Sequence, residues 1–383
     1  MKNNFNLKLI KLKYLLLTLL VICGSTGCAS EDAESIELHD DVEITFSHAT
    51  ESRSTYTTTG NLTNKSFAVF GDMRFKRETD PASPNTIVLN GAEVKFSNNA
   101  WTYNDTQFWF PDHVHSFVAL HPFSAIGSLI SGVQYADSRL SFNYTHPSNS
   151  LNTADLLIAT HRRDYSSANP NAKDDVTLPF RHIMTAVEFT AKYTEPLAYN
   201  NQNNRIHVKK IELDGVSVRG SYTVIPDDIS GTVLNSYSNA DSWTITGTGS
   251  VTFQSNSPTW ICNIPTDPAK PVFTNADALI MLPKAKGDVP MRLYFDLYVN
   301  GDKVAEHTVS TTISDAVWKA GEKVTYNLVI SVGKVIIGGC TIEPWENIGD
   351  LTETITDSSG DHDAGSGNLS SGQWTDINLS DGR

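Results

Sequence analysis

Cysteine, basic residues and long apolar runs are all scarce in this chain. Only four Cys occur in 383 residues, which excludes a disulfide framework and a Cys-rich zinc array. Lys and Arg number 29 against 43 Asp and Glu, and this acidic balance argues against a nucleic-acid binder, because such proteins present a basic face. The motifs G-x-S-x-G, H-E-x-x-H and G-x-x-x-x-G-K-[ST] are missing, and no spacing singles out a carboxylate pair for glycoside hydrolysis. We therefore expect no enzyme activity and no cofactor.

The first 40 residues have the composition of an export signal. Four lysines and no acidic residue precede an apolar run of nine residues, Tyr14–Ile22, which is far short of the ~20 residues that span a bilayer. Small residues then lead to Cys28, an order that resembles a bacterial lipoprotein signal. We predict a lipoprotein signal peptide at 1–27, lipidation of Cys28 and an acidic tether over 28–40. A plain secretory signal with an incidental cysteine is the alternative.

Short strand-like segments dominate the rest of the chain. They are rich in β-branched and aromatic residues, several alternate between apolar and polar side chains, and Asn, Gly, Ser and Pro clusters separate them. Beyond the signal, no window carries an apolar stripe of helical period. The clearest segments are 42–47, 65–70, 93–96, 116–120 and 187–193. Ala154–Thr160 is either a short helix or a buried strand. The sequence therefore predicts an all-β protein.

A polar, Asn-rich stretch, Thr194–Arg205, divides these segments into two groups. Short strands at this spacing favour sandwiches, with barrels as the alternative. We predict an N-terminal β-sandwich at 41–196 and a C-terminal β-sandwich at 205–348.

The composition changes again after Trp345. Residues 349–383 are rich in Gly, Ser and Asp, which favours a disordered tail. An extended strand is the alternative. Leu351, Glu353 and Ile355 alternate cleanly with threonines, whereas the apolar residues of 374–379 are split between two faces.

Histidines and aspartates offer two weak metal patterns. His113 and His115 share a strand face with His121 nearby, but an ordinary half-exposed strand explains them better than a metal site, which needs a third ligand and outer support. The aspartates of 357–363 lack the EF-hand order. We predict no bound metal.

Two cysteines remain outside the export signal, Cys262 and Cys340, both in strand-like surroundings. An oxidising envelope would allow a disulfide between them. Buried free thiols are the alternative, because sequence does not place their Cα atoms within bonding range.

Tryptophans would stack on sugar rings if they were exposed, although core packing is the default for Trp in sandwiches. The six in the two predicted sandwiches are Trp101, Trp109, Trp243, Trp260, Trp318 and Trp345.

Motifs in a fixed order carry a family resemblance. After the lipobox come ITFS (44–47), an arginine at 53 and SFAVFG (66–71), then the aromatic and apolar stretch 101–123, DLLIA (155–159) and LPFRHIMTAVEFTAKY (178–193). The second half continues with VKKIELDGVSVRGSY (208–222), ALIMLPK (278–284), WKAGEKVTYNLVIS (318–331) and TIEPW (341–345). This order resembles the fimbrillin (Mfa-like) family of surface lipoproteins of Gram-negative anaerobes.

The resemblance implies a fold and a role. The fold is two tandem transthyretin-like β-sandwich domains, and the role is that of a stalk, tip or anchor subunit of fimbriae, adhesive filaments at the outer-membrane surface. A protease would cut after Arg53 and free the strand that carries Val42, Ile44 and Phe46. A strand from another subunit would then fill the groove. Other fimbrial subunits, a lipid anchor in the outer membrane and a host or bacterial surface ligand are the implied partners.

A second hypothesis keeps the β-sandwiches and changes the role. It is a surface glycan-binding lipoprotein of a polysaccharide-uptake system, which would present two or three Trp or Tyr side chains together on an exposed face.

Overall fold

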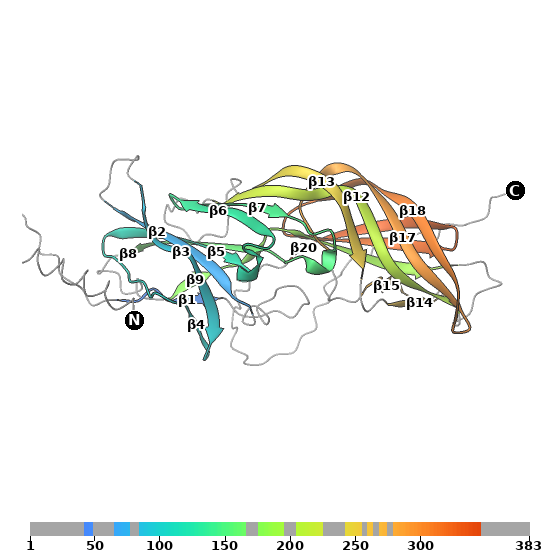
Figure 1. The fold of residues 1–383 in the computed structure, drawn as a ribbon, viewed down its shortest axis with the longest axis horizontal. Coiled ribbons are helices and arrows are strands. Elements are labelled where there is room, and N and C mark those ends of the chain that lie inside the picture. The colour runs from blue at the N-terminus through green and yellow to red at the C-terminus, as the bar shows by residue number, and fades with distance from the viewer. Residues whose placement is uncertain are drawn as a thin grey trace, which may run out of the picture. The chain divides into compact units, whose positions relative to one another are not determined.

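The computed structural model describes residues 42–48, 65–76, 84–165, 175–194, 204–224, 242–254, 259–262, 268–273 and 279–345. These residues belong to one compact unit, Val42–Arg383. They form β-strands and two short 3₁₀ turns, with no α-helix among them (Figure 1). The all-β prediction is therefore confirmed. The predicted signal peptide (1–27), tether (28–40) and tail (349–383) lie outside the described residues.

A six-stranded antiparallel sheet comes from the first half of the chain, in the order β10-β8-β5-β2-β3-β4. Its strands are β2 (Phe67–Phe75), β3 (Thr86–Ser97), β4 (Ala100–Thr102), β5 (His113–His121), β8 (Leu157–Tyr165) and β10 (Arg181–His182). The central strands are buried on both faces, which explains their unbroken apolar runs. Along β2, for example, Phe67 and Val69 enter one core cluster while Ala68 and Phe70 enter another. The ambiguous segment Ala154–Thr160 leads into strand β8.

A seven-stranded sheet is organised around one long strand, β12 (Asn204–Val224). The first part of β12 pairs with β17 and its last part pairs with β7. A register shift between Leu213 and Val216, where Gly215 has a φ of +68°, lets the strand bend without ending. The other strands are β6 (Ile130–Ala136), β7 (Arg139–Thr145), β13 (Ser242–Gln254), β14 (Trp260–Cys262), β17 (Lys284–Val299) and β18 (Asp302–Trp318).

A five-stranded sheet contains β11 (Thr185–Tyr193), β15 (Lys270–Pro271), β16 (Leu279–Met281), β19 (Glu322–Ser331) and β20 (Lys334–Pro344). Strand β11 runs parallel to β19, and Val187 lies opposite Val324. Strand β11 lies in the predicted N-terminal domain and β19 lies in the predicted C-terminal domain, so this pair of strands joins segments from both sides of the predicted boundary. The division at 196 and 205 stays a prediction.

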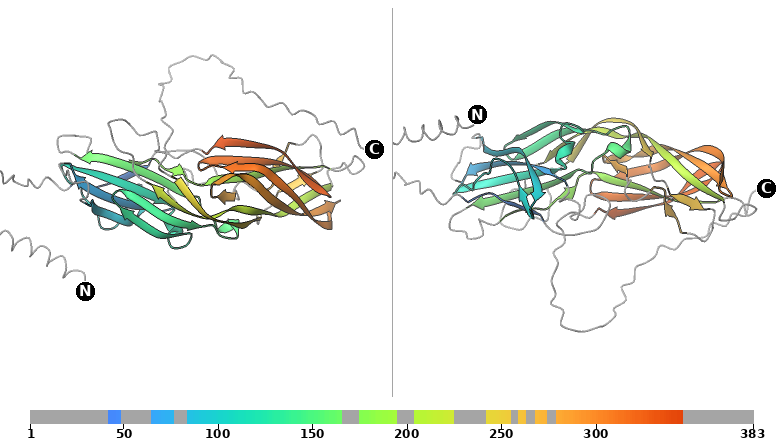
Figure 2. Two further views of the ribbon diagram at one scale, coloured as in Figure 1. Left: turned by 90° about the horizontal axis from the view of Figure 1, so that it is seen from above. Right: turned by 60° about the horizontal axis from the view of Figure 1, so that its bottom comes forward.

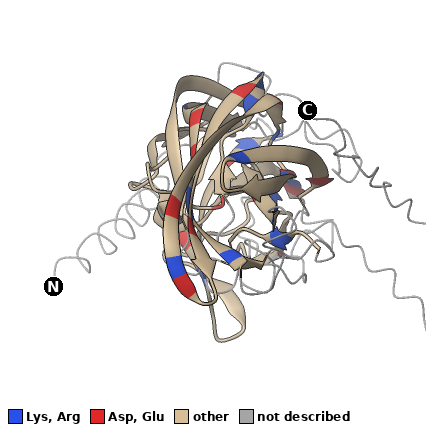
Figure 3. Ribbon diagram, turned by 90° about the vertical axis from the view of Figure 1, so that its right-hand side faces the viewer, with Lys and Arg blue, Asp and Glu red and all other residues tan. Residues whose placement is uncertain are grey.

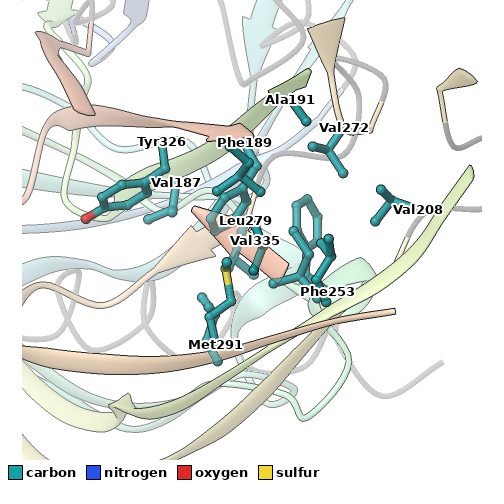
Figure 4. Packing of buried hydrophobic residues seen from close by; sticks show 14 of the residues in the cluster. Val187, Phe189, Ala191, Val208, Phe253, Val272, Leu279, Met291, Tyr326 and Val335 are labelled. Carbon is teal, nitrogen blue, oxygen red and sulfur yellow. The ribbon is translucent and has the colours of Figure 1, made fainter. Parts of the chain in front are cut away.

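The largest core cluster joins side chains of the five- and seven-stranded sheets. Figure 4 shows Val187, Phe189 and Tyr326 of this cluster together with Phe253 and Met291. Trp318 is buried in the same cluster, and its indole N–H donates to the Tyr326 hydroxyl at 3.0 Å. Figure 2 shows the long strands from two further sides, with β17 and β18 running beside β12.

Candidate functional site

The N-terminal strand, residues 42–48, is bound at the edge of the first-half core. Its last three residues form β1 (Phe46–His48), which pairs in parallel with β9 (Val176–Leu178) (Figure 1). Residues 42–45 precede β1 in an extended path. This strand carries Val42, Ile44 and Phe46, the side chains of the removable strand that the family resemblance implies.

Alternation places the three apolar side chains on the inner face of the N-terminal strand. Ile44 is 0% exposed and Phe46 is 4% exposed, while Val42 packs partly buried against the same cluster. The ring of Phe46 meets Tyr103 at 5.5 Å and Phe117 at 5.9 Å, both edge-on. The intervening Glu43 is exposed. The inner face therefore acts as a plug in an apolar slot.

Backbone hydrogen bonds hold the N-terminal strand on both sides. On one side the amide of Ile44 donates to the carbonyl of Gln107 at 2.8 Å, and the amide of Trp109 donates to Val42 at 2.9 Å. On the other side the amide of Val176 donates to the carbonyl of Thr45 at 2.7 Å. If the strand left, these donors and acceptors would be exposed together with an apolar slot, which is the surface that an incoming strand satisfies.

The side chain of Tyr103 links the N-terminal strand to the segment that contains Gln107. Its hydroxyl donates to the carbonyl of Ile44 at 2.9 Å and accepts from the amide of Gln107 at 3.1 Å. Burial raises the pKa of Tyr103, so the hydroxyl stays protonated and able to donate. Tyr103 thus ties the strand to the segment that flanks it.

The slot has apolar and aromatic walls, and His115 is a buried histidine among them. His115 is 0% exposed, and burial lowers its pKa to about 4, so the imidazole is neutral near neutral pH. Its ring lies 4.9 Å from that of Trp109, over which the Arg163 guanidinium lies at 5.1 Å. The core residues around the plug are Phe67, Val69, Trp101, Trp109, Phe117, Tyr165, Val176, Leu178 and Phe180.

The histidine pattern does not form a metal site among the described residues, and the aspartates of 357–363 lie outside them. His121 is buried against Phe180, and neither of its ring nitrogens has a hydrogen-bond partner in the described part of the chain. Within the same residues, no three His, Cys, Asp or Glu side chains are grouped so as to hold a metal ion. No helix described in the structure is long and apolar enough to cross a membrane.

The remaining predicted site residues lie elsewhere. Cys28 and Arg53 are outside the described residues. Cys262, half-buried on β14, and Cys340, exposed on β20, are free thiols in different sheets, so the structure does not contain the disulfide that their pairing would form.

Five of the six tryptophans are withdrawn from the surface. Trp101, Trp109, Trp318 and Trp345 are buried, and the Trp243 indole is half-buried with its N–H donating to the carbonyl of Ile183 at 2.6 Å. Only Trp260 among the six is exposed, at 36%. The tryptophans alone therefore do not form the group of two or three exposed Trp or Tyr side chains that the glycan hypothesis predicts.

Sequence reasoning missed the partners of the N-terminal strand, which are Tyr103, Gln107 and β9. The run Val176–Leu178 gives a faint signal, because two apolar residues flank a threonine just before Pro179. Nothing in the sequence links it to residue 46.

Comparisons with known proteins give one matching family model. A family model described as fimbrillin-like matches residues 53–345, a range that begins at Arg53 and leaves out the N-terminal strand. The solved structure of a fimbrial protein from Bacteroides vulgatus ATCC 8482 is 18% identical with a TM-score of 0.50, covering 79% of this chain and 99% of that one. A candidate cell adhesion protein from Bacteroides uniformis ATCC 8492 is 16% identical with a TM-score of 0.44, covering 80% and 100%. At such identities the first likeness shows the fold alone. A search of curated proteins gives no match.

Proposed function

This chain belongs to the fimbrillin-like family, as its ordered motifs predicted, and from that premise we propose that it is a structural and adhesive subunit of fimbriae which joins its neighbours by exchanging the N-terminal strand. The subunit is exported as a lipoprotein anchored through Cys28 at the outer membrane. It has no enzymatic role. The observation that carries the proposal is the plug formed by Ile44 and Phe46, both withdrawn from solvent in an edge position.

The first step is cleavage after Arg53. The cut separates the N-terminal strand from the rest of the fold, because residue 53 follows the strand in the chain. Seven residues held by two buried side chains and a few hydrogen bonds can then dissociate. The exposed slot and its unpaired backbone groups receive a strand from the next subunit.

The tail of the chain contains a segment of the right pattern for that strand. Thr375–Ser380 reads T-D-I-N-L-S, whereas Val42–Ser47 reads V-E-I-T-F-S. Aligned in this way, Ile377 takes the place of Ile44 and Leu379 that of Phe46, while Asp376 takes the place of the exposed Glu43. The cleaner alternation at 351–355 fits less well, since Glu353 would bring a carboxylate to the fully buried place of Ile44.

The test uses fimbriae sheared from cells and run on denaturing gels, unboiled and boiled. The expected result is a heat-sensitive ladder whose subunits begin at Ser54, with loss of the ladder in Arg53→Ala. Arg139→Ala is the matched control, because Arg139 is an exposed arginine in a turn-flanked strand away from the site. A normal ladder from Arg53→Ala would refute the cleavage step.

A charge placed on either face of the tail segment tests the donor strand. Ile377→Asp would push a carboxylate into the slot and abolish the ladder, whereas Asn378→Asp makes a similar charge change on the outward face and leaves the ladder intact. Equal ladders from both variants would exclude 375–380 as the donor.

A reversible lock tests release of the strand itself. Ser47 and Thr177 are register partners whose hydroxyl oxygens lie 3.4 Å apart, so Ser47→Cys with Thr177→Cys places two thiols for a disulfide. We expect cleavage at Arg53 to continue, the ladder to disappear and reduction to restore it. The Ser47→Cys single variant is the control, and a ladder that forms despite the lock would overturn strand exchange.

A further inference from the structure

A partly exposed aromatic cluster lies on the outer face of the seven-stranded sheet, away from the N-terminal strand. Trp260 of β14 pairs in register with His207 of β12, and Arg205 of β12 pairs with Tyr298 of β17. The residues between them, Ile206 and Ile261, point inward to the core. The four outward side chains therefore share one patch, which we call the Trp260 cluster.

The rings of the Trp260 cluster are already ordered by one another. The His207 and Trp260 rings stack at 4.5 Å with an interplanar angle of 19°, and Tyr298 meets Trp260 edge-on at 4.8 Å. The Arg205 guanidinium lies 4.0 Å from the centre of the Trp260 ring. Trp260 nevertheless stays 36% exposed. A ligand that binds such a preformed surface loses little side-chain freedom in the protein.

The charges beside the cluster are unevenly compensated. Lys209 lies 3.2 Å and 3.4 Å from the carboxylates of Asp296 and Glu306, and Lys303 lies 3.0 Å from Asp296. Arg205 forms no ion pair with any carboxylate of the described residues; its one recorded contact is with the Trp260 ring. Figure 3 shows acidic and basic residues interspersed along the long strands. Among the described residues, Arg205 is therefore a cation without a carboxylate partner, next to the partly exposed indole of Trp260.

We infer that the Trp260 cluster binds a carboxylated sugar. The C–H groups of a pyranose ring can pack on the part of the Trp260 indole that His207 and Arg205 leave exposed, and the planar guanidinium of Arg205 matches a carboxylate with two parallel hydrogen bonds. The Tyr298 hydroxyl and the His207 ring nitrogens have no hydrogen-bond partner recorded within the described residues and can serve sugar hydroxyls. Uronic acids and sialic acids share this chemistry. The site is separate from strand exchange, because its residues lie on β12, β14 and β17, which belong to another sheet than β1.

The experiment measures binding of defined sugars to the purified mature chain by Trp fluorescence and saturation-transfer NMR. The probes are an oligogalacturonate, sialyllactose, neutral lactose and the methyl ester of the oligogalacturonate. We expect binding of at least one carboxylated probe, with the ester and lactose weaker by about tenfold or more, since a hydrogen bond to a charged group is lost. Which acidic probe binds distinguishes a uronic acid from a sialic acid.

Variants assign the binding to the cluster. Arg205→Gln should bind acidic and esterified probes equally weakly, and Trp260→Ala should bind neither. Arg292→Gln is the matched control for charge, because Arg292 lies on β17 but is already paired with Asp214 at 3.1 Å. Ile336→Ala is the control for an exposed apolar residue, at 46% exposure on β20. Equal binding of acid and ester, retained binding in Trp260→Ala, or no binding of either acidic probe would overturn the inference. So would a Trp260→Ala variant whose only defect is in association between subunits.

Discussion

Truncation of Phe46 is the sharpest test of how the N-terminal strand is held. Phe46 is 4% exposed and its ring contacts two other aromatic rings. Removing a buried phenylalanine side chain costs about 3–5 kcal/mol when the surroundings do not collapse. Aromatic walls on both sides leave little room to collapse, so we expect Phe46→Ala to weaken the attachment of the N-terminal strand by up to that amount.

The free energy that binds the N-terminal strand to the rest of the fold sets an upper limit on this loss. Burial of Ile44 and Phe46 contributes about 3–6 kcal/mol, whereas ordering seven residues costs about 7–14 kcal/mol in backbone entropy. The hydrogen bonds to Gln107, Trp109, Val176 and Tyr103 must supply much of the difference, at about 0.5–1.5 kcal/mol each. Burial and hydrogen bonding therefore exceed the entropy cost of ordering the strand by little. Loss of the Phe46 ring should release the strand while the rest of the core stays folded.

Two measurements separate these effects. Guanidinium unfolding followed by Trp fluorescence reports the core, because Trp101 and Trp109 belong to the same cluster. Hydrogen exchange at the amide of Ile44, which donates to Gln107, reports release of the strand. Glu43→Ala is the control, because Glu43 is exposed and such surface changes stay within about 0.5 kcal/mol. If Phe46→Ala changed neither the unfolding midpoint nor the exchange of Ile44, the packing described for the plug would be refuted.

Three further predictions concern other parts of the fold. Burial lowers the pKa of His121 to about 3 from 6.5. As the pH drops from 6.5 toward 3, the unfolded chain therefore binds the proton first and the free energy of unfolding falls. His121→Leu should flatten this decline in denaturation curves measured at several pH values, and an unchanged slope would contradict the assignment. Trp345 stacks on His182 at 3.9 Å, and Trp345→Ala should cost about 3–5 kcal/mol in the same assay, with a loss below about 1 kcal/mol counting against it. Cys262 and Cys340 should both react with a thiol reagent in the native protein, Cys340 slowly near neutral pH because burial raises its pKa; a chain without reactive thiols would contradict the free state.

Local pattern was enough to predict the strands themselves. Their β-branched and aromatic composition predicted strands at 42–47, 65–70 and 116–120, where the structure has the N-terminal strand, β2 and β5. Such patterns depend only on neighbouring residues and on which sheet faces are covered. For the same reason Ala154–Thr160 stayed ambiguous, since a short apolar run fits a helix turn and a buried strand equally well.

Pairing between distant segments was beyond the reach of those patterns. The hydrogen bond between the side chains of Thr45 and Asp175 spans 130 residues, and no local preference encodes it. The Trp260 cluster is another case, because its four residues come from three strands and become neighbours only through the register of β12. Cys262 and Cys340 also show this limit. Both have strand-like surroundings in the sequence, yet they lie in different sheets.

Strand β12 also has a mechanical consequence for a filament under flow. Its 21 residues hydrogen-bond to β17 along one part and to β7 along the other. Ladder hydrogen bonds lie across the strand direction, so a pull along β12 loads many of them in shear at once instead of opening them one at a time. Tension that enters through one end of this strand is thus carried by a continuous backbone, with no linker between the two ladders to yield first.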